Sequence, residues 1–274
     1  MFWLLIKLTY NKVVKKQKLY FNIPNFKQEI LKRLVIFALS FMLIFVVSYN
    51  IKSFIRVWNI INYDADLQKL KALKEEKGLQ ALIEINDSCF AYLECDDLDI
   101  HLPIVNVNST KEGDYYLNHD FFKRENELGS PYQKYGTKLN QTTNTVLIGH
   151  SAYTGTLFNI SKSRSIFGRF NEYLYANSNF NYTFKIETLD DIFEYKVIGV
   201  IKYNTKNKTS NELQIYNTVN LNSQSQFDSF YNLVKSKSLI NNLESASFGD
   251  KFITIYTCAT DNLDYRVMVV AKQV

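Results

Sequence analysis

The 274-residue chain is poor in the residues from which metal centres and disulfide frameworks are built. It has three cysteines and three histidines, and neither C-x-x-C nor H-x-x-x-H spacing occurs among them. Cys89 and Cys95 lie six residues apart, which is too far along an extended strand for a local disulfide. The sequence therefore predicts no metal site and no cofactor, and it predicts that both of these thiols are small core side chains.

Glycine and proline are also scarce, with nine and three residues, which argues against collagen-like and low-complexity chains. Hydrophobic residues make up 46% of the chain and aromatic residues 15%, enough to bury the core of one main domain. The net charge of +5 is concentrated in residues 1–33, which carry eight Lys or Arg against the single acid Glu29. That tail is +7 and residues 34–274 are −2, so we expect no basic face and no nucleic-acid partner.

Charge is missing altogether from residues 34–51, LVIFALSFMLIFVVSYNI, which are bounded by Lys32–Arg33 and Lys52. Such a helix is about 27 Å long, enough to cross a bilayer core. No A-x-A-like cleavage site follows it, so the pattern favours an uncleaved anchor over a signal peptide. Because positive residues stay on the cytoplasmic side, residues 1–33 are predicted to be a cytoplasmic tail. The chain is therefore predicted to be a single-pass cell-membrane protein with an extracellular C-terminal part.

Beyond the anchor, residues 52–78 are predicted to form an extracellular stalk helix that ends near Gly78. Apolar residues recur there at helical spacing: Ile55, Trp58, Ile61, Leu67, Leu70 and Leu73. Residues 79–274 change to short β-type runs: CFAYLEC, IHLPIV, NTVLIGH, NYTFKIET, FEYKVIGVIKY, KFITIYTC and YRVMVVAK. Helical patches are expected at 157–175 and 225–237. Many short strands with few helices indicate a closed or nearly closed barrel.

Three side chains with complementary chemistry stand at the ends of these runs. Cys258 and His150 each end a β-type run, and Arg266 begins the run that follows Cys258. If the strands are neighbours, a thiolate could attack a carbonyl while the histidine moves protons and the cation stabilises the oxyanion. The two remaining histidines have less reactive settings: His119 is expected to order the loop before DFF, and His101 to be a surface or edge residue of its strand.

From about Leu79 to the C-terminus, the chain resembles the class B sortases, the membrane-anchored cysteine transpeptidases of Gram-positive bacteria. Four blocks carry the resemblance, and they occur along the chain in the same order as in that family. TIYTC is similar to the cysteine motif of that family, and RVMVVAK to its terminal strand with the arginine at the same spacing. GHSAYTGTLFN is similar to its histidine motif. LPIV and DYYLNHDFFKRENELGSPYQKY resemble the block before the active-site strand. The resemblance implies a mainly β fold, a closed eight-stranded barrel with added helices.

The resemblance also implies a reaction. Cys258 would attack the carbonyl after the Thr of a C-terminal sorting signal, and an amine of a peptidoglycan precursor or cross-bridge would resolve the thioacyl enzyme. His150 resembles the general acid and base of the family, and Arg266 its substrate-positioning, oxyanion-stabilising arginine. The substrate-binding residues are predicted to be Asn118, Thr257 and Tyr256.

The chain departs from the family pattern beside the two reactive residues. Tyr256 stands where class B members usually carry a small hydroxyl residue, Ile255 replaces the usual Leu, and Ile148 stands where several members have Tyr. These departures bear on the sorting motif rather than on the reaction. The polar stretch 203–220 is either a plain surface loop or, as the resemblance implies, part of the substrate groove.

Other functions share parts of this pattern. A pilin-polymerising sortase would use a pilin lysine as the acceptor, and a membrane-anchored cysteine hydrolase would release the product to water. A catalytically silent surface-binding barrel is disfavoured because Cys258, His150 and Arg266 are all present. Anchoring beside the site of wall synthesis favours transpeptidation over hydrolysis.

Overall fold

The computed structural model describes residues 25–151, 166–168, 170, 182–207, 209, 211–241, 244–259, 262 and 264–274. The chain divides into two compact units, Met1–Arg56 and Val57–Val274, and each is described by itself. The predicted helical patch at 157–175 lies almost entirely outside the described residues.

The long helix α2 (Asn25–Lys77) supplies what is described of the first unit. Its segment Gln28–Tyr49 has 22 residues with a mean hydropathy of 2.5, so by length and composition it could cross a membrane. The described helix continues without a break over the residues of both the predicted anchor and the predicted stalk. α2 ends at Lys77, where Gly78 adopts the left-handed φ of 76° that glycine tolerates best. The second unit begins at Val57, so the last turns of α2 pack as part of it.

The second unit is built on a closed barrel of eight strands in the order β1-β2-β3-β4-β7-β8-β6-β5, which confirms the predicted fold. The strands are β1 (Cys89–Cys95), β2 (Ile100–Val105), β3 (Tyr132–Gln133), β4 (Asn144–Ile148), β5 (Thr183–Glu187), β6 (Ile192–Asn204), β7 (Phe252–Cys258) and β8 (Tyr265–Gln273). Two neighbouring pairs, β2–β3 and β4–β7, are parallel and the other pairs are antiparallel. Of the strands within the described residues, the prediction missed only β3, whose two residues are too few to show any alternation.

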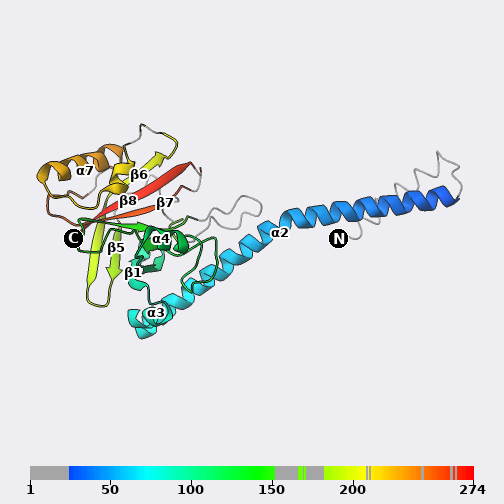
Figure 1. Ribbon diagram of the computed structural model, residues 1–274, viewed down its shortest axis with the longest axis horizontal. Helices are drawn as coiled ribbons and strands as arrows, with labels where there is room; N and C mark the ends of the chain where they lie inside the picture. The colour runs from blue at the N-terminus through cyan, green and yellow to red at the C-terminus, as the bar shows by residue number, and fades with distance from the viewer. Residues whose placement is uncertain are drawn as a thin grey trace. The chain divides into compact units, whose positions relative to one another are not determined.

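Short helices cover parts of the barrel: α3 (Leu79–Ile85), the 3-10 turn η1 (Asp96–Leu98), α4 (Thr110–Tyr116), α6 (Leu213–Asn217) and α7 (Gln224–Lys237). The predicted helix at 225–237 is confirmed by α7, which packs along β6 (Figure 1). α3 corrects the expectation of β structure from Leu79, since Leu79 and Leu82 are buried one helical turn apart. The stretch 203–220 is more than a surface loop, because it contains α6 and buries Ile215.

Alternation along β7 separates the two faces of the barrel wall. Ile253 and Ile255 belong to the core inside the barrel, and Phe252 packs with the phenylalanines of α7 on the outside. Even-numbered side chains of β7 therefore point outward, and Cys258 is the last of them.

Cys89 and Cys95 are buried with free thiols, as predicted, and burial raises the pKa of each to about 12.

Candidate active site

Cys258 and Arg266 are direct cross-strand partners at the end of the β7–β8 ladder. The next pair along is closed by a hydrogen bond from the Ala259 N–H to the Tyr265 carbonyl, 3.0 Å. Cys258 and Arg266 therefore form a non-hydrogen-bonded pair, the kind in which facing side chains come closest. Both are half-buried. The structure thus brings the predicted thiol and the predicted cation together.

His150 reaches the same end of the barrel on the neighbouring strand. β4 runs parallel to β7 with Ile148 opposite Tyr256, so His150 and Cys258 each lie two residues beyond a matched pair. The Gly149 N–H donates to the Tyr256 carbonyl at 3.2 Å, which extends the ladder past the end of β4. Spacing in the sequence left this adjacency open, and the parallel pairing establishes it.

Close packing explains why glycine precedes this histidine. A Cβ on Gly149 would lie 2.8 Å from a ring carbon of Phe167 and 2.9 Å from Ile166 Cγ2, both buried side chains. The Phe167 N–H also donates to the His150 carbonyl at 3.1 Å. The turn that carries the imidazole is therefore held against Ile166 and Phe167 by its backbone.

The contact of the imidazole fixes its tautomer. His150 Nε2 lies 2.9 Å from the Leu117 carbonyl oxygen. A carbonyl only accepts, so Nε2 must carry a hydrogen and, in the neutral ring, Nδ1 is left as the proton acceptor. Nδ1 is therefore the atom of His150 that is available for proton transfer.

The three predicted substrate-binding residues have different surroundings. Thr257 is buried, and its hydroxyl donates to the Gly149 carbonyl at 2.8 Å. Its side chain faces the barrel interior and ties β7 to the turn before His150, so it does not fit a groove-lining role. Asn118 is exposed, follows the carbonyl that contacts His150, and donates from its amide to the Asp114 carbonyl at 3.2 Å. Tyr256 points outward and is half-buried.

An aromatic cluster surrounds Tyr256. Its hydroxyl lies 2.9 Å from that of Tyr203, and its ring centroid lies 4.6 Å from that of Tyr216 on α6. Tyr203 is also the β6 partner of Arg266. Burial, reinforced by the bond to Tyr256, raises the pKa of Tyr203, while the Arg266 charge acts in the opposite direction. Lys134 places its Nζ 3.8 Å from the Tyr216 ring centre, and burial lowers the Lys134 pKa.

Sequence reasoning did not single out Tyr203, Tyr216 or Lys134. Period-two alternation along β6 could have placed Tyr203 on the outer face, but no local signal indicated that α6 or Lys134, the residue after β3, would contribute to this surface.

The other two histidines lie elsewhere. His119 stacks on Tyr115 with ring centroids 3.7 Å apart and has Nδ1 2.9 Å from the Tyr115 carbonyl, so it orders its loop as expected. His101 was expected at the surface or an edge, and this was wrong. A closed barrel has no edge strand, and the His101 side chain is only 12% exposed. Among the described residues, no three His, Cys, Asp or Glu side chains are grouped as metal ligands.

Two curated proteins are similar in sequence to this chain. Sortase B of Staphylococcus aureus is 23% identical over 221 residues, which cover 77% of this chain and 83% of that protein. Sortase B of Listeria monocytogenes is 24% identical over 188 residues, which cover 68% and 69%. No family model matches the chain.

Solved structures show the same fold. Sortase B of Clostridium perfringens superposes with a TM-score of 0.60 at 20% identity over 71% of this chain and 98% of that one. The Staphylococcus aureus sortase B–substrate complex superposes with a TM-score of 0.60 at 21% identity over 78% and 95%. At these identities the likeness of the structures establishes the barrel fold.

Proposed function

Because the chain is related in sequence and fold to the class B sortases, we propose that it is a cysteine transpeptidase that cleaves C-terminal sorting signals and transfers the surface protein to an amine. One observation carries the proposal: Cys258 is paired with Arg266 at the end of β7, and parallel β4 carries His150 alongside them. Acyl transfer needs a nucleophile, a proton carrier and a group that stabilises the oxyanion, and these three residue types can supply them.

In the first step, the Cys258 sulfur attacks the carbonyl carbon of the Thr of the sorting signal, at the bond that follows this Thr. An S–C bond forms, and the carbonyl oxygen gains a negative charge, which we infer that the Arg266 guanidinium stabilises. His150 takes the thiol proton at Nδ1 and returns it to the leaving nitrogen as the C–N bond breaks. A thioester between Cys258 and the surface protein remains.

In the second step, an acceptor amine attacks the thioester carbonyl and loses its proton to the same Nδ1. The S–C bond breaks, a new amide bond forms, and the sulfur recovers its proton. A structure of Staphylococcus aureus sortase B has been solved with a substrate, and another sortase B structure has been solved with triglycine. Relatives therefore accommodate both a substrate and a glycine peptide. For this chain we infer the amine of a peptidoglycan precursor or cross-bridge as the acceptor.

The proposed location follows from charge and hydropathy. Gln28–Tyr49 is long and apolar enough to span a bilayer, and the +7 tail before residue 34 favours the cytoplasm for the N-terminus. Residues 52–274 then lie outside the cell, with the catalytic unit next to the growing wall. Residues 1–33 would be the tail and 34–51 the core of the anchor.

The fate of the acyl group separates a transpeptidase from a hydrolase. The full-length protein in detergent is incubated with a cleavable sorting peptide and increasing triglycine, and both products are quantified by mass spectrometry. The proposal predicts that the transfer product replaces the hydrolysis product as triglycine rises, and that Cys258→Ala makes neither. Cleavage that yields only the hydrolysis product with triglycine, and also with a pilin-type lysine peptide, would identify a hydrolase.

A further inference from the structure

The last turns of α2 contact the loop that holds His150. Tyr63 of α2 is 3% exposed, and its hydroxyl donates to the Gly129 carbonyl at 2.9 Å. Leu67 and Leu70 continue this packing one and two turns further on. Residues 117–129, called here the histidine-support loop, run from the carbonyl that contacts His150 to the carbonyl that contacts Tyr63.

The two ends of the histidine-support loop lie against each other. Gly129 has φ 62°, and a Cβ there would lie 2.8 Å from the Leu117 carbonyl oxygen. The Gly129 backbone therefore packs directly on the oxygen that accepts from His150 Nε2. Gly129 thus lies between the Tyr63 hydroxyl, from which its own carbonyl accepts, and the Leu117 carbonyl oxygen, which accepts from His150. We therefore expect a shift of Tyr63 to move the Leu117 carbonyl.

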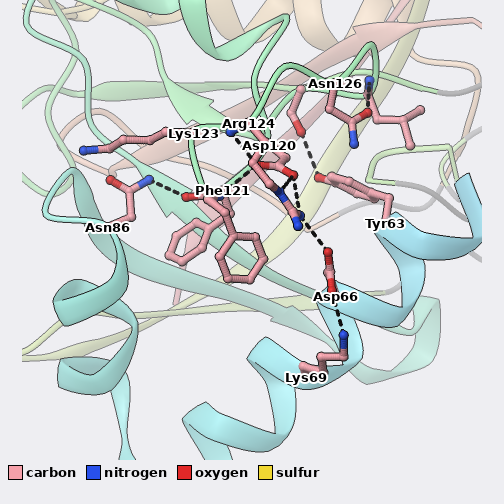
Figure 2. Close-up of polar contacts among 12 residues, drawn as sticks. Tyr63, Asp66, Lys69, Asn86, Asp120, Phe121, Lys123, Arg124 and Asn126 are labelled. Atoms are coloured by element: carbon pink, nitrogen blue, oxygen red, sulfur yellow. Dashed lines mark hydrogen bonds and ion pairs between the residues drawn. The ribbon is translucent and has the colours of Figure 1, made fainter. Parts of the chain in front are cut away.

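A second tether joins α2 to the middle of the same loop. Arg124 Nη2 lies 2.6 Å from Asp66 of α2 and 2.6 Å from Asp120 of the loop, so it stands between the two carboxylates (Figure 2). The Asp120 side chain is 3% exposed and also accepts from the N–H groups of Phe122 and Arg124 at 2.9 and 3.0 Å. The loop is thus folded around a buried carboxylate whose counter-ion is shared with α2.

We propose that Tyr63, Asp66 and Arg124 are positioning residues that hold the Leu117 carbonyl against His150 and so keep Nδ1 free for proton transfer. This inference rests on the proposed function for its catalytic meaning. The part of α2 from Val57 onward is then a working part of the catalytic unit rather than a spacer. Loosening it would leave Cys258 and Arg266 in place, because neither β7 nor β8 takes part in these contacts.

The test uses the full-length protein with two substitutions that cut the tethers without removing bulk, Tyr63→Phe and Asp66→Asn, singly and together. Lys69→Gln is the matched control, because Lys69 donates to the same Asp66 at 2.9 Å but lies on α2 itself and is 74% exposed. Misplacing a catalytic group by about 1 Å can cost roughly a hundredfold in rate. We expect the double variant to lose about ten- to a hundredfold in kcat with KM within about twofold, and Lys69→Gln to match the wild type.

A second measurement reads the imidazole without using activity. Histidine-selective nitrogen-15 labelling of the same proteins reports which ring nitrogen carries the hydrogen, and His150→Gln assigns the signal. The wild type is expected to hold His150 as the Nε2–H tautomer and the double variant to populate both tautomers. A purely structural role would lower the melting temperature and leave the tautomer unchanged.

Wild-type kcat and an unchanged tautomer in the double variant would overturn the inference. If that protein does not fold, Tyr63→Phe alone decides by the same two readings, because it removes one oxygen only. A wild-type protein that forms no acyl enzyme would overturn the proposed function, while the tautomer of His150 would still test the tether.

Discussion

The hydroxyl of Thr257 offers a quantitative test of how β7, which carries Cys258, is held to the turn that carries His150. It donates to the Gly149 carbonyl at 2.8 Å, within the core and one residue from both Cys258 and His150. Valine has nearly the same shape, so Thr257→Val removes the bond and leaves a buried carbonyl without that donor. An orphaned buried acceptor costs about 1–3 kcal/mol. At about 2–4 °C per kcal/mol for a domain of this size, the melting temperature should fall by roughly 2–12 °C.

Thr257→Ser is the matched control, because it keeps the hydroxyl and loses one buried methyl group, a change worth about 0.8 kcal/mol. We expect the valine variant to acylate at least about tenfold more slowly than the serine variant, because a loosened turn allows the distance between Cys258 and His150 to vary. The assay is a thermal melt of each protein together with the rate of thioester formation on a sorting peptide. A valine variant that melts at or above the serine variant and acylates at the wild-type rate would refute this reasoning.

Three further predictions concern the cation Arg266, the three thiols and the half-buried Lys74. Arg266→Lys should lower kcat/KM about 10²–10³-fold with little change in melting temperature, because lysine cannot reproduce the paired donors of a guanidinium, and activity within about threefold of wild type would remove Arg266 from the catalytic set. Iodoacetamide at pH 8 should label only Cys258 of the folded protein, because burial raises the pKa of Cys89 and Cys95 to about 12. All three cysteines should be labelled after denaturation. Labelling of Cys89 or Cys95 in the native protein would contradict this prediction. Burial lowers the pKa of Lys74, but its bonds to Glu187 and Glu94 at 2.6 and 3.1 Å outweigh this effect and raise the pKa overall. Lys74→Met should therefore lower the melting temperature at pH 7, and the difference from wild type should shrink as the pH rises above about 10.4, the unfolded value, and through the raised folded pKa. A difference in melting temperature that does not depend on pH would contradict this prediction.

Local pattern was sufficient for most of the barrel. Short β-type runs marked seven strands because each has at least five residues and several of them are buried, as in β7. The same reasoning failed for β3, which has two residues, and for α3, whose seven residues are compatible with either structure. Short elements are selected by the neighbours on which they pack, and those neighbours are distant in the sequence.

The residues of the candidate site could be proposed from the sequence, but the contacts that support them could not. Cys258, His150 and Arg266 were chosen from their types and strand ends, and the ladder places them together. The tether from Tyr63 to Gly129 spans 66 residues of sequence, and no local pattern identifies such a pair. Thr257 shows the opposite limit: its motif suggested contact with substrate, and strand alternation buries its hydroxyl instead.

The most direct test of the proposed chemistry is the mass of the enzyme itself after it meets a sorting peptide. The full-length protein is mixed with a library of sorting peptides without an acceptor, quenched in acid and measured intact, and then digested to locate the adduct. We predict an added mass equal to that of the peptide acid ending at its Thr less one water, attached to Cys258, lost on addition of hydroxylamine or triglycine, and absent from Cys258→Ala. An adduct on any other residue, or peptide cleavage that persists in Cys258→Ala, would contradict it.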